Sequence, residues 1–456
     1  MAVAHSARSA DAGRVLFVAR EPDETLRTFL PIVDCLEERH GLESRVLFHH
    51  PPGEWARSEL DRRGIRLREV ELPARILPAR LLQTRIGGSK SVRTLDEIGR
   101  FLRASALARR ALDREQPRAV VVIQDTLLLE RFLVRQANRQ GIPTLVVQWA
   151  FNYTQAMYDH LRGIQHARPT AVQTSASRSR LLAPVTSAAY HALLRTLGLS
   201  FQHANSYGGG EARLFAVWGE AFKAQYTAQG VRHKRIAVTG HPTHDAAYAR
   251  AASIDDRQRA RIRARYALPT DGPLVLYATQ PVLWRRVIGP AELEANVRAI
   301  AASVAAVGAQ LVLKLHPRER PEDYAFTKWL DPPIPVLTRA EMPDLVAACD
   351  LFVSSSSSTV LLAMMLDRPI VTVNFNQIPH FDYFEPLGGA LHTRTPAEFA
   401  RALPLALADE PTRARLARER RAVLDRYTRF DGQATDRLAG LIVGAIADSQ
   451  HRPRLC

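Results

Sequence analysis

The 456-residue chain has few cysteines and few aromatic residues. Its three cysteines, Cys35, Cys349 and Cys456, lie far apart, which excludes a disulfide framework or a zinc-binding spacing and predicts a reducing compartment. No run of about 18 apolar residues occurs, so we expect no transmembrane helix. The first residues are small and polar without an apolar core, so they do not resemble a secretory signal, and we expect residues 1–13 to be a disordered lead-in.

Motifs for common cofactors and metals are also missing. The chain has no well-formed Gly-x-Gly-x-x-Gly loop and no Walker lysine loop, which disfavours a dinucleotide-dependent enzyme and an ATPase. No Asp-x-Asp stands near a predicted strand end, so we expect no bound metal ion. The enzyme classes that depend on these motifs are therefore disfavoured.

Positive charge is in excess, because 62 Lys and Arg residues face 46 Asp and Glu residues, a net charge of +16. Such an excess attracts nucleic acid, anionic lipid or phosphate-bearing substrates, and an arginine-rich solvated surface accounts for it equally well. The basic residues are spread along the chain rather than gathered in a recognition helix. A non-catalytic polyanion binder is therefore an alternative, and nucleic acid is not the expected partner.

Apolar runs alternate with helical periodicities along most of the chain. This alternation predicts parallel sheets with right-handed crossovers. The helices between the strands end at glycine or proline in several places. The predicted strands lie at 14–20, 44–49, 66–72, 119–124, 144–147, 214–218, 235–239, 274–278, 310–315, 336–337, 351–353 and 370–373.

We therefore expect an α/β protein with two doubly wound, Rossmann-like domains facing a central cleft. The N-terminal, acceptor-side domain covers 14–239, the nucleotide-donor domain covers 240–430, and a C-terminal helix and tail cover 431–456. Ligands of open α/β sheets bind at the loops that leave the carboxyl ends of the strands. The segment 153–211 is less regular and includes an apolar helix predicted at 181–199. Packing on the N-terminal domain is favoured for it over contact with a membrane or an acceptor.

The most informative motif is Lys314-Leu315-His316-Pro317-Arg318, directly after an apolar strand. Lys314, His316 and Arg318 at a strand end are well placed to bind phosphate through charge-assisted hydrogen bonds of about 1.5–3 kcal/mol each. His316 can also give a proton to a leaving group near neutral pH. The alternative is a solvated strand terminus with an incidental His-Pro pair.

A run of hydroxyl residues lies between a predicted strand and an apolar helix. Hydroxyls and free backbone N–H groups at the start of a helix form an anion site. Capping the helix requires one hydroxyl and not six, so a loop that holds phosphate is the better explanation. The residues predicted to hold phosphate are Ser355, Ser356, Ser357, Ser358 and Thr359.

Two further loops follow predicted strands. Gln280 comes after one strand, and Arg285 behind it can add a phosphate contact, although an ordinary basic loop explains this stretch nearly as well. Gly240 and His241 follow another strand, where glycine lets the backbone approach a ligand closely. A hinge role and a ligand role are compatible at this turn.

Together these motifs resemble those of GT-B glycosyltransferases of bacterial surface polysaccharide synthesis. Neighbouring families are the CDP-glycerol glycerophosphotransferases, the capsule sialyl- and Kdo-transferases and the UDP-N-acetylglucosamine 2-epimerase-like proteins. The resemblance covers about 14–447 and is strongest from Leu214 onward. It rests on Gly219, Gly230, Gly240-His241-Pro242, Thr279-Gln280-Pro281, Lys314-Leu315-His316-Pro317, the hydroxyl run and Arg429-Phe430-Asp431-Gly432.

The resemblance implies that His316, the hydroxyl run and the Gln280 loop bind the phosphates of a nucleotide-activated donor. It also implies that the final helix crosses back onto the N-terminal domain. The chain departs from its relatives at two places. It has Val360-Leu361-Leu362-Ala363 where many relatives have a ribose-binding glutamate, and Gln148-Trp149-Ala150-Phe151 where some have a Trp-His-Gly-Thr base motif. Ribose recognition and the catalytic base must then come from elsewhere.

Our candidate base is Asp125, at the end of the strand 119–124, with Asp23 and Glu24 in the first strand–helix loop as reserves. Such a carboxylate takes the proton of an acceptor hydroxyl while His316 and the hydroxyl run stabilise the departing phosphate. An acid that pairs with a helix dipole is the equally open alternative for Asp125.

The sequence thus predicts a metal-independent glycosyltransferase that moves a sugar from a UDP-, CMP- or CDP-linked donor to a cell-surface polysaccharide or glycolipid. No further cofactor is expected. We expect a cytoplasmic protein, and a lipid-linked acceptor would bring it to the inner face of the cytoplasmic membrane. The remaining alternatives are a CDP-glycerol-type polyol-phosphate transferase and a nucleotide-sugar 2-epimerase, and the missing glutamate counts against the epimerase.

Overall fold

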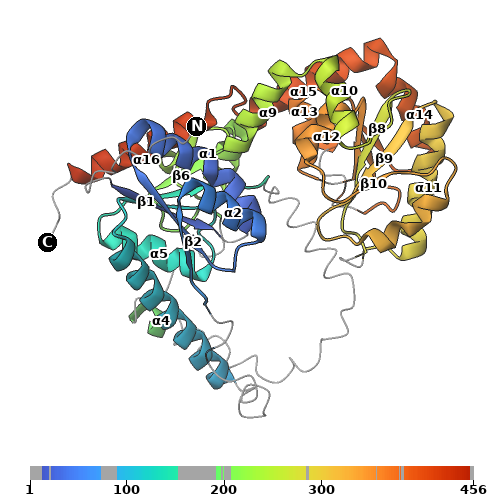
Figure 1. The fold of residues 1–456 in the computed structure, drawn as a ribbon. Helices are drawn as coiled ribbons and strands as arrows, with labels where there is room; N and C mark the ends of the chain where they lie inside the picture. The colour runs from blue at the N-terminus through green and yellow to red at the C-terminus, as the bar shows by residue number, and fades with distance from the viewer. Residues whose placement is uncertain are drawn as a thin grey trace. The chain divides into compact units, whose positions relative to one another are not determined.

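The computed structural model describes residues 13–19, 22–72, 76, 90–151, 192–196, 199, 207–283, 287–355, 357–378, 381 and 385–451. They form two compact α/β units (Figure 1). The first unit takes its residues from 1–149, 170–243 and 433–456, and the second from 150–169 and 244–432. The predicted lead-in, except for Gly13, lies outside the described residues, and so does most of the helix predicted at 181–199.

The first unit is built on a parallel sheet in the order β3-β2-β1-β4-β5-β6-β7. Its central strands are almost wholly buried, as expected for apolar runs in a sheet covered on both faces. The strands are β1 Arg14–Ala19, β2 Glu43–Phe48, β3 Arg66–Glu69, β4 Ala119–Val122, β5 Thr144–Val147, β6 Leu214–Val217 and β7 Ile236–Val238.

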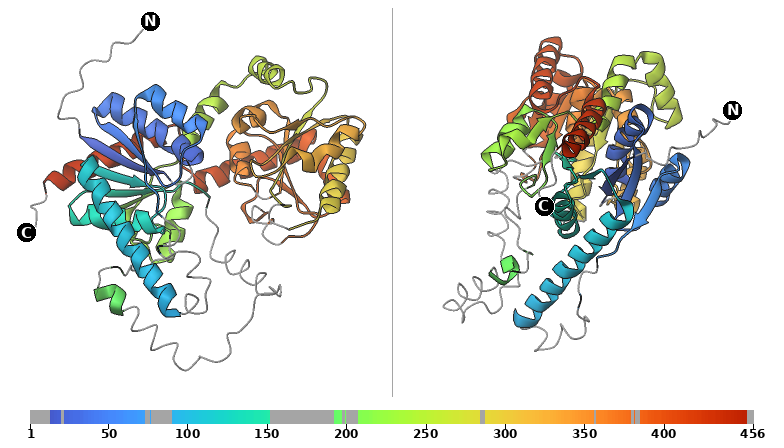
Figure 2. Two further views of the ribbon diagram at one scale, coloured as in Figure 1. Left: turned by 60° about the horizontal axis from the view of Figure 1, so that its bottom comes forward. Right: turned by 90° about the vertical axis from the view of Figure 1, so that its left-hand side faces the viewer.

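Helices cover both faces of this sheet (Figure 2). One face packs against α1, α2 and α16, where Phe17 of β1 meets Phe29 of α1 with ring centroids 4.9 Å apart. The long helix α4 lies beside α5. The described helices of this unit are α1 Pro22–His40, α2 Glu54–Arg63, α4 Lys90–Glu115, α5 Leu128–Arg139, α8 Glu220–Ala228, the short 3-10 helix η1 His233–Arg235 and α16 Ala434–Gln450.

The second unit has a parallel sheet in the order β10-β9-β8-β11-β12-β13. Its strands are β8 Leu274–Ala278, β9 Gln310–Lys314, β10 Val336–Leu337, β11 Leu351–Ser354, β12 Ile370–Val373 and β13 Leu391–Thr393. Its helices are α9 Pro242–Ser253, which begins in the first unit, α10 Asp256–Arg265, α11 Pro290–Ala306, the 3-10 helix η2 Pro321–Trp329, α12 Met342–Ala348, α13 Thr359–Met365, α14 Pro396–Leu407 and α15 Glu410–Tyr427.

The architecture confirms the predicted fold class of two doubly wound α/β units, and α16 returns to pack on α1. Four of the described elements were not predicted, namely α9, β13 and the two 3-10 helices η1 and η2. The turn expected at Gly240 and His241 leads directly into α9, a helix with little amphipathic pattern that starts at a proline. The strand β13 has only three residues and is fixed by pairing with β12, which no local sequence pattern signals.

Each sheet has one point where the strand order reverses. It lies between β1 and β4 in the first sheet and between β8 and β11 in the second, because the chain fills one side of the sheet before crossing to the other. Loops that leave the carboxyl ends of strands on either side of such a point diverge and leave a crevice where ligands bind. The loops at these two positions are therefore the candidates for ligand binding.

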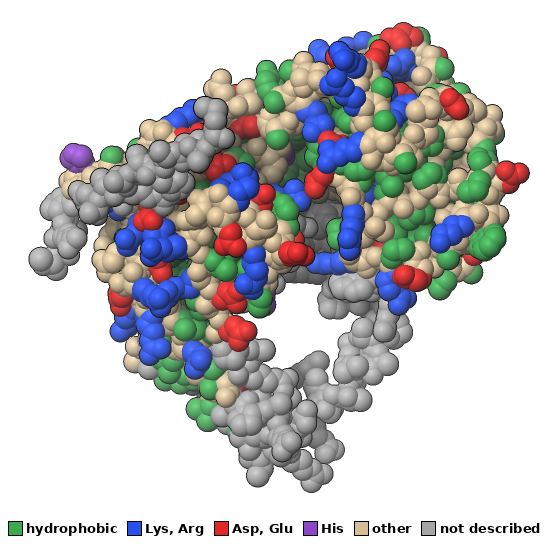
Figure 3. Space-filling model, in the orientation of Figure 1, with side chains coloured by type: hydrophobic (Ala, Val, Ile, Leu, Met, Phe, Trp, Pro, Cys, Tyr) green, Lys and Arg blue, Asp and Glu red, His purple; other side chains and the backbone are tan. Residues whose placement is uncertain are grey.

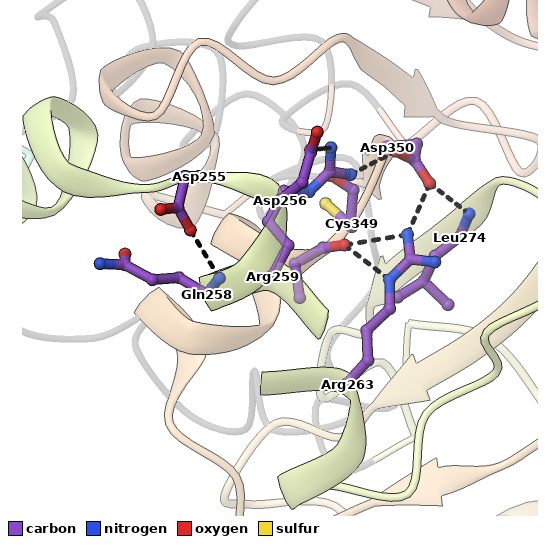
Figure 4. Close-up of polar contacts among 9 residues, drawn as sticks. Asp255, Asp256, Gln258, Arg259, Arg263, Leu274, Cys349 and Asp350 are labelled. Carbon is purple, nitrogen blue, oxygen red and sulfur yellow. Dashed lines mark hydrogen bonds and ion pairs between the residues drawn. The ribbon is translucent and has the colours of Figure 1, made fainter. Parts of the chain in front are cut away.

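The opposite, amino-terminal edge of the second sheet holds an ionic network (Figure 4). Asp350, just before β11, accepts hydrogen bonds from Arg263 and from the backbone N–H of Leu274, both at 2.7 Å, and pairs with Arg259. Burial opposes the charge of Asp350, yet these donors keep its pKa below the usual value. The network connects α10 to β8 and β11 and serves the fold of this unit.

Candidate functional site

Three neighbouring strands of the second sheet end in polar loops, and we call the loops after β8, β9 and β11 the second-sheet edge. The register pairs Ala278 with both Lys314 and Ser354, so the residues that follow these three positions lie side by side. The structure thus brings the predicted Gln280, His316 and Ser355 to one edge, with Gln280 and Ser355 on the two sides of the reversal point. Arg285 and Ser356 lie outside the described residues.

The imidazole of His316 is partly buried and has a defined hydrogen-bond arrangement. Its Nδ1 accepts the backbone N–H of Arg318 at 3.1 Å. Because Nδ1 acts as the acceptor, the neutral ring carries its proton on Nε2. A His316 held in this tautomer is prepared to donate from Nε2, which is what binding of a phosphate oxygen requires.

The loop of His316 is held by Glu319, a residue that the sequence analysis missed. Its carboxylate accepts hydrogen bonds from the backbone N–H of His316 at 2.9 Å, the Tyr324 hydroxyl at 2.6 Å and the Thr279 hydroxyl. Burial raises the pKa of Glu319, and these donors partly offset that effect. Glu319 thereby connects the loops after β8 and β9 to η2. The sequence signal that could have revealed Glu319 is its position directly after His316-Pro317-Arg318 at the end of a strand.

Lys314 and Arg318 differ in their surroundings. The ammonium of Lys314 is buried and donates to the carbonyl oxygens of Leu315 at 2.9 Å and Thr338 at 3.1 Å. Burial lowers the pKa of Lys314. Arg318 is exposed beside a hollow. In this structure Lys314 therefore joins the loops after β9 and β10, and its contact with phosphate stays a prediction.

The hydroxyl run divides into residues with different roles. Ser355 is buried and hydrogen-bonds Tyr277, whose pKa is nevertheless raised to about 12 by burial. The hydroxyl of Ser357 accepts the backbone N–H of Thr359 at 3.3 Å and its hydroxyl at 2.8 Å. Ser358 is exposed. Ser357 thus serves the local start of α13, and among the described residues of the run Ser358 is the exposed one.

Two cavities adjoin this edge. A cavity of about 30 Å³ is lined by residues that include Tyr277, Gln280 and Ser355, and it has room for about one water molecule. A larger open hollow of about 780 Å³ is lined by residues that include Arg318 and Glu319. Its volume lies within the range of about 300–1,000 Å³ typical of small-molecule sites. Of the residues predicted to bind phosphate, Arg318 lines this hollow, and the acids Glu292, Glu319 and Asp323 line it as well.

The corresponding loops of the first sheet, which we call the first-sheet edge, contain Asp125. Its two carboxylate oxygens accept the backbone N–H groups of Gly208 at 2.8 Å and Gly210 at 2.9 Å. A side chain at position 210 would place its Cβ 2.6 Å from Asp125, so only glycine fits there. Burial raises the pKa of Asp125 and these hydrogen bonds partly offset the rise. The geometry favours a loop-holding role, and a role as base stays a prediction.

Gly240 and His241 lie in the turn after β7 of the first sheet. Gly240 has φ of +80°, which favours glycine. The ring of His241 is buried against Trp218, and its Nδ1 lies 2.7 Å from the Thr243 hydroxyl. Burial lowers the pKa of His241 to about 3, so the ring is neutral at physiological pH. His241 thus packs inside the first unit, and its predicted contact with a ligand remains untested.

The loops after β1 and β2 bring further ionisable groups to the first-sheet edge. Asp23 is exposed and lies next to Gly53, whereas the side chain of Glu24 is outside the described part. His49 follows β2, and its Nε2 lies 3.3 Å from the carboxylate of Glu130 in α5. The sequence analysis missed this pair because its two members belong to separate strand–helix units. Within the described ranges, no three His, Cys, Asp or Glu side chains gather to hold a metal ion.

The chain is similar to several solved structures. It aligns with the wall teichoic acid polymerase TagF at 12% identity and a TM-score of 0.52, over 96% of this chain and 90% of that one. MnaA of S. aureus, in a co-structure with UDP, matches at 15% identity and a TM-score of 0.56, over 97% and 99%. UDP-GlcNAc 2-epimerase from Neisseria meningitidis, bound to UDP-GlcNAc, matches at 14% identity and a TM-score of 0.54, over 94% and 100%. No curated protein matches the sequence significantly.

A family model matches the C-terminal part of the chain. Residues 218–444 fit the family described as CDP-Glycerol:Poly(glycerophosphate) glycerophosphotransferase. This segment includes the whole second-sheet edge and the first part of the returning helix α16, up to residue 444. The similar structures share the two-unit fold at identities that establish fold alone. The chain thus shares the two-unit fold of these structures, and its residues 218–444 match the family described as CDP-Glycerol:Poly(glycerophosphate) glycerophosphotransferase.

Proposed function

We propose that this protein transfers a group from a nucleotide-activated donor to a hydroxyl of a cell-surface polymer or glycolipid, and that the donor phosphates bind at the second-sheet edge. The arrangement of His316 carries this proposal. Its ring is set to donate from Nε2, and Glu319 fixes the loop that presents it. Gln280 and Ser355 stand beside it at the reversal point of the sheet.

The chemistry of such a transfer matches these groups. As the donor bond breaks, the nucleotide phosphate leaves and gains negative charge. A positioned N–H from His316, the hydroxyls of the run and the guanidinium of Arg318 stabilise that charge without reorganising. Glu319 accepts hydrogen bonds from Thr279, Tyr324 and the backbone N–H of His316. These three donors offset its negative charge, which would otherwise repel the phosphate.

The transferred group has two candidates. The family match over 218–444 supports glycerol phosphate, in which case the acceptor oxygen bonds to phosphorus and CMP leaves. The motif pattern of the sequence favours a sugar, in which case the acceptor oxygen bonds to the anomeric carbon and a nucleoside diphosphate or CMP leaves. Incubation with CDP-glycerol or with nucleotide sugars, followed by mass and phosphorus NMR analysis, separates them, because one product holds a phosphodiester and the other a glycosidic bond.

Nucleotide binding is the first test. Purified protein is melted with UDP, CMP, CDP, GDP and ADP, since a ligand that binds the folded state raises the melting temperature. We expect one of these nucleotides to stabilise the wild type and not His316→Ala. The matched control is His233→Ala, which removes an exposed histidine of the first unit and is expected to keep the full shift. No shift with any nucleotide, or equal shifts in both variants, would contradict the proposed donor site.

We also propose contact with the inner face of the cytoplasmic membrane, as a lipid-linked acceptor would require. The described helices include none long and apolar enough to cross a bilayer. Leu95 and Leu102 are exposed on α4, with Arg103 beside them, and the chain has a net charge of +16. On the face shown in Figure 3, Lys and Arg side chains are interspersed with acidic ones. Flotation with anionic liposomes at low salt should recover the protein, and its absence from the floated fraction would refute the contact.

A further inference from the structure

His49 and Glu130 form a partly buried pair at the first-sheet edge. The Nε2 of His49 lies 3.3 Å from a carboxylate oxygen of Glu130. The side chain of Glu130 is 1% exposed, whereas that of His49 is 12% exposed. The carboxylate is therefore held inside the unit, and the imidazole reaches toward the surface of the edge.

The fold places this pair at the reversal point of the first sheet. His49 directly follows β2, and its backbone N–H donates to the carbonyl of Ala19, the last residue of β1, at 3.3 Å. Glu130 lies in the first turn of α5, the helix after β4. Because β1 lies between β2 and β4, the two side chains meet across the end of β1. Ligands of open α/β sheets bind at this position.

A histidine beside a buried carboxylate is suited to accept a proton. The negative charge of the carboxylate stabilises the imidazolium that forms when the second ring nitrogen is protonated. Asp125, at the same edge, has both oxygens engaged by the backbone of the Gly208–Gly210 loop. Among the described residues of this edge, His49 combines a ring beside a buried carboxylate with partial exposure.

We propose that His49 is the general base that deprotonates the acceptor hydroxyl, with Glu130 as its positioning residue; this rests on the proposed transferase function. The hydroxyl proton moves to Nδ1 of His49 as the acceptor oxygen bonds to the donor phosphorus or anomeric carbon. The bond from that atom to the nucleotide phosphate oxygen breaks, and its electron pair leaves on the phosphate. The proton then passes from Nδ1 to solvent.

The test is transfer by His49→Ala with the donor identified by product analysis. We expect kcat to fall about 100-fold or more, the usual range for loss of a general base. The nucleotide-dependent rise in melting temperature should stay at its wild-type size, because the donor phosphates bind in the other unit. Added imidazole should restore part of the turnover, which a purely structural role of His49 does not predict. The matched control is His50→Ala, which removes the exposed neighbouring histidine and is expected to retain activity.

Two further variants keep the inference falsifiable. His49→Gln keeps a polar side chain beside Glu130 and is expected to lose kcat like His49→Ala, even if the alanine variant folds poorly. Glu130→Gln keeps the shape of the acid, and we expect about a tenfold lower kcat with an unchanged KM for the donor and no response to imidazole. Full turnover in His49→Gln, or loss in His49→Ala that imidazole does not restore, overturns the base assignment while the transferase function stands. A wild type that binds no nucleotide and transfers no group overturns the proposed function instead.

Discussion

The two sheet edges share a topology and differ in the residues that follow their strands. Each edge has a carboxylate that holds loops and whose pKa is raised by burial, Asp125 being buried and Glu319 partly buried. Asp125 accepts two glycine N–H groups, whereas Glu319 accepts two hydroxyls and the N–H of His316. Glu319 leaves a histidine prepared to donate, whereas the first edge has Glu130 beside a histidine prepared to accept. We propose that the same sheet architecture serves anion binding at one edge and proton acceptance at the other.

The largest predicted loss of stability and of nucleotide binding follows from removal of the Glu319 carboxylate at the second-sheet edge. Glu319→Ala leaves three donors without their acceptor, and each costs about 1–3 kcal/mol, so we expect the second unit to lose about 3 kcal/mol and nucleotide binding to disappear. Urea denaturation and thermal shift measure the two effects. Glu322→Ala, at an exposed acid of η2, is the matched control and should change neither. Wild-type nucleotide affinity in Glu319→Ala would show that the second-sheet edge does not depend on this acid.

A slightly smaller loss of stability, without loss of binding, is expected at the opposite edge of the second sheet. Asp350→Ala removes the acceptor of Arg263 and of the Leu274 N–H, and we expect about 2 kcal/mol lower stability in urea. Nucleotide affinity, measured on the folded protein without urea, should be unchanged because the network lies at the amino-terminal ends of the strands. Asp256→Ala, at an exposed acid of α10, serves as the control. Impaired nucleotide binding in folded Asp350→Ala would mean that the two edges are coupled.

The contrast between Asp125 and His49 is sharpened by Asp125→Asn. The amide keeps one acceptor for the loop but turns its NH₂ group toward the other glycine N–H, so we expect a loss of about 1–2 kcal/mol. Turnover should remain near the wild-type value if Asp125 only holds the loop. A fall of kcat of about 100-fold in a folded Asp125→Asn protein would instead identify Asp125 as the base and remove that role from His49.

The sequence was sufficient for features that depend on local pattern. Buried strands are continuous apolar runs, so the sheets were predictable, and so was the place of His316 at the end of one of them, whereas its role in phosphate binding stays a prediction. Features that depend on residues distant in the sequence could not be predicted from it. β13 exists because β12 offers an edge to pair with, and Glu130 is informative only once β1 and β2 place His49 beside it. The side-chain direction of Lys314, toward Leu315 and Thr338, likewise follows from packing that no motif encodes.

The last prediction concerns pH and the buried ring of His241 in the first unit. The pKa of His241 is lowered to about 3 in the folded state, against about 6.5 in the unfolded chain. The unfolded state therefore binds a proton as pH falls below about 6.5 and the folded state does not, so stability declines by about 1.4 kcal/mol per pH unit until about pH 3.

Urea denaturation at pH 7.5, 6 and 5 should show this decline in the wild type and a shallower one in His241→Gln. His233→Gln, at an exposed site of the same unit, is the matched control and should keep the wild-type slope. Equal slopes for His241→Gln and the wild type would mean that the His241 ring accepts a proton in the folded protein, and the first-sheet edge would then hold a second histidine able to take up charge.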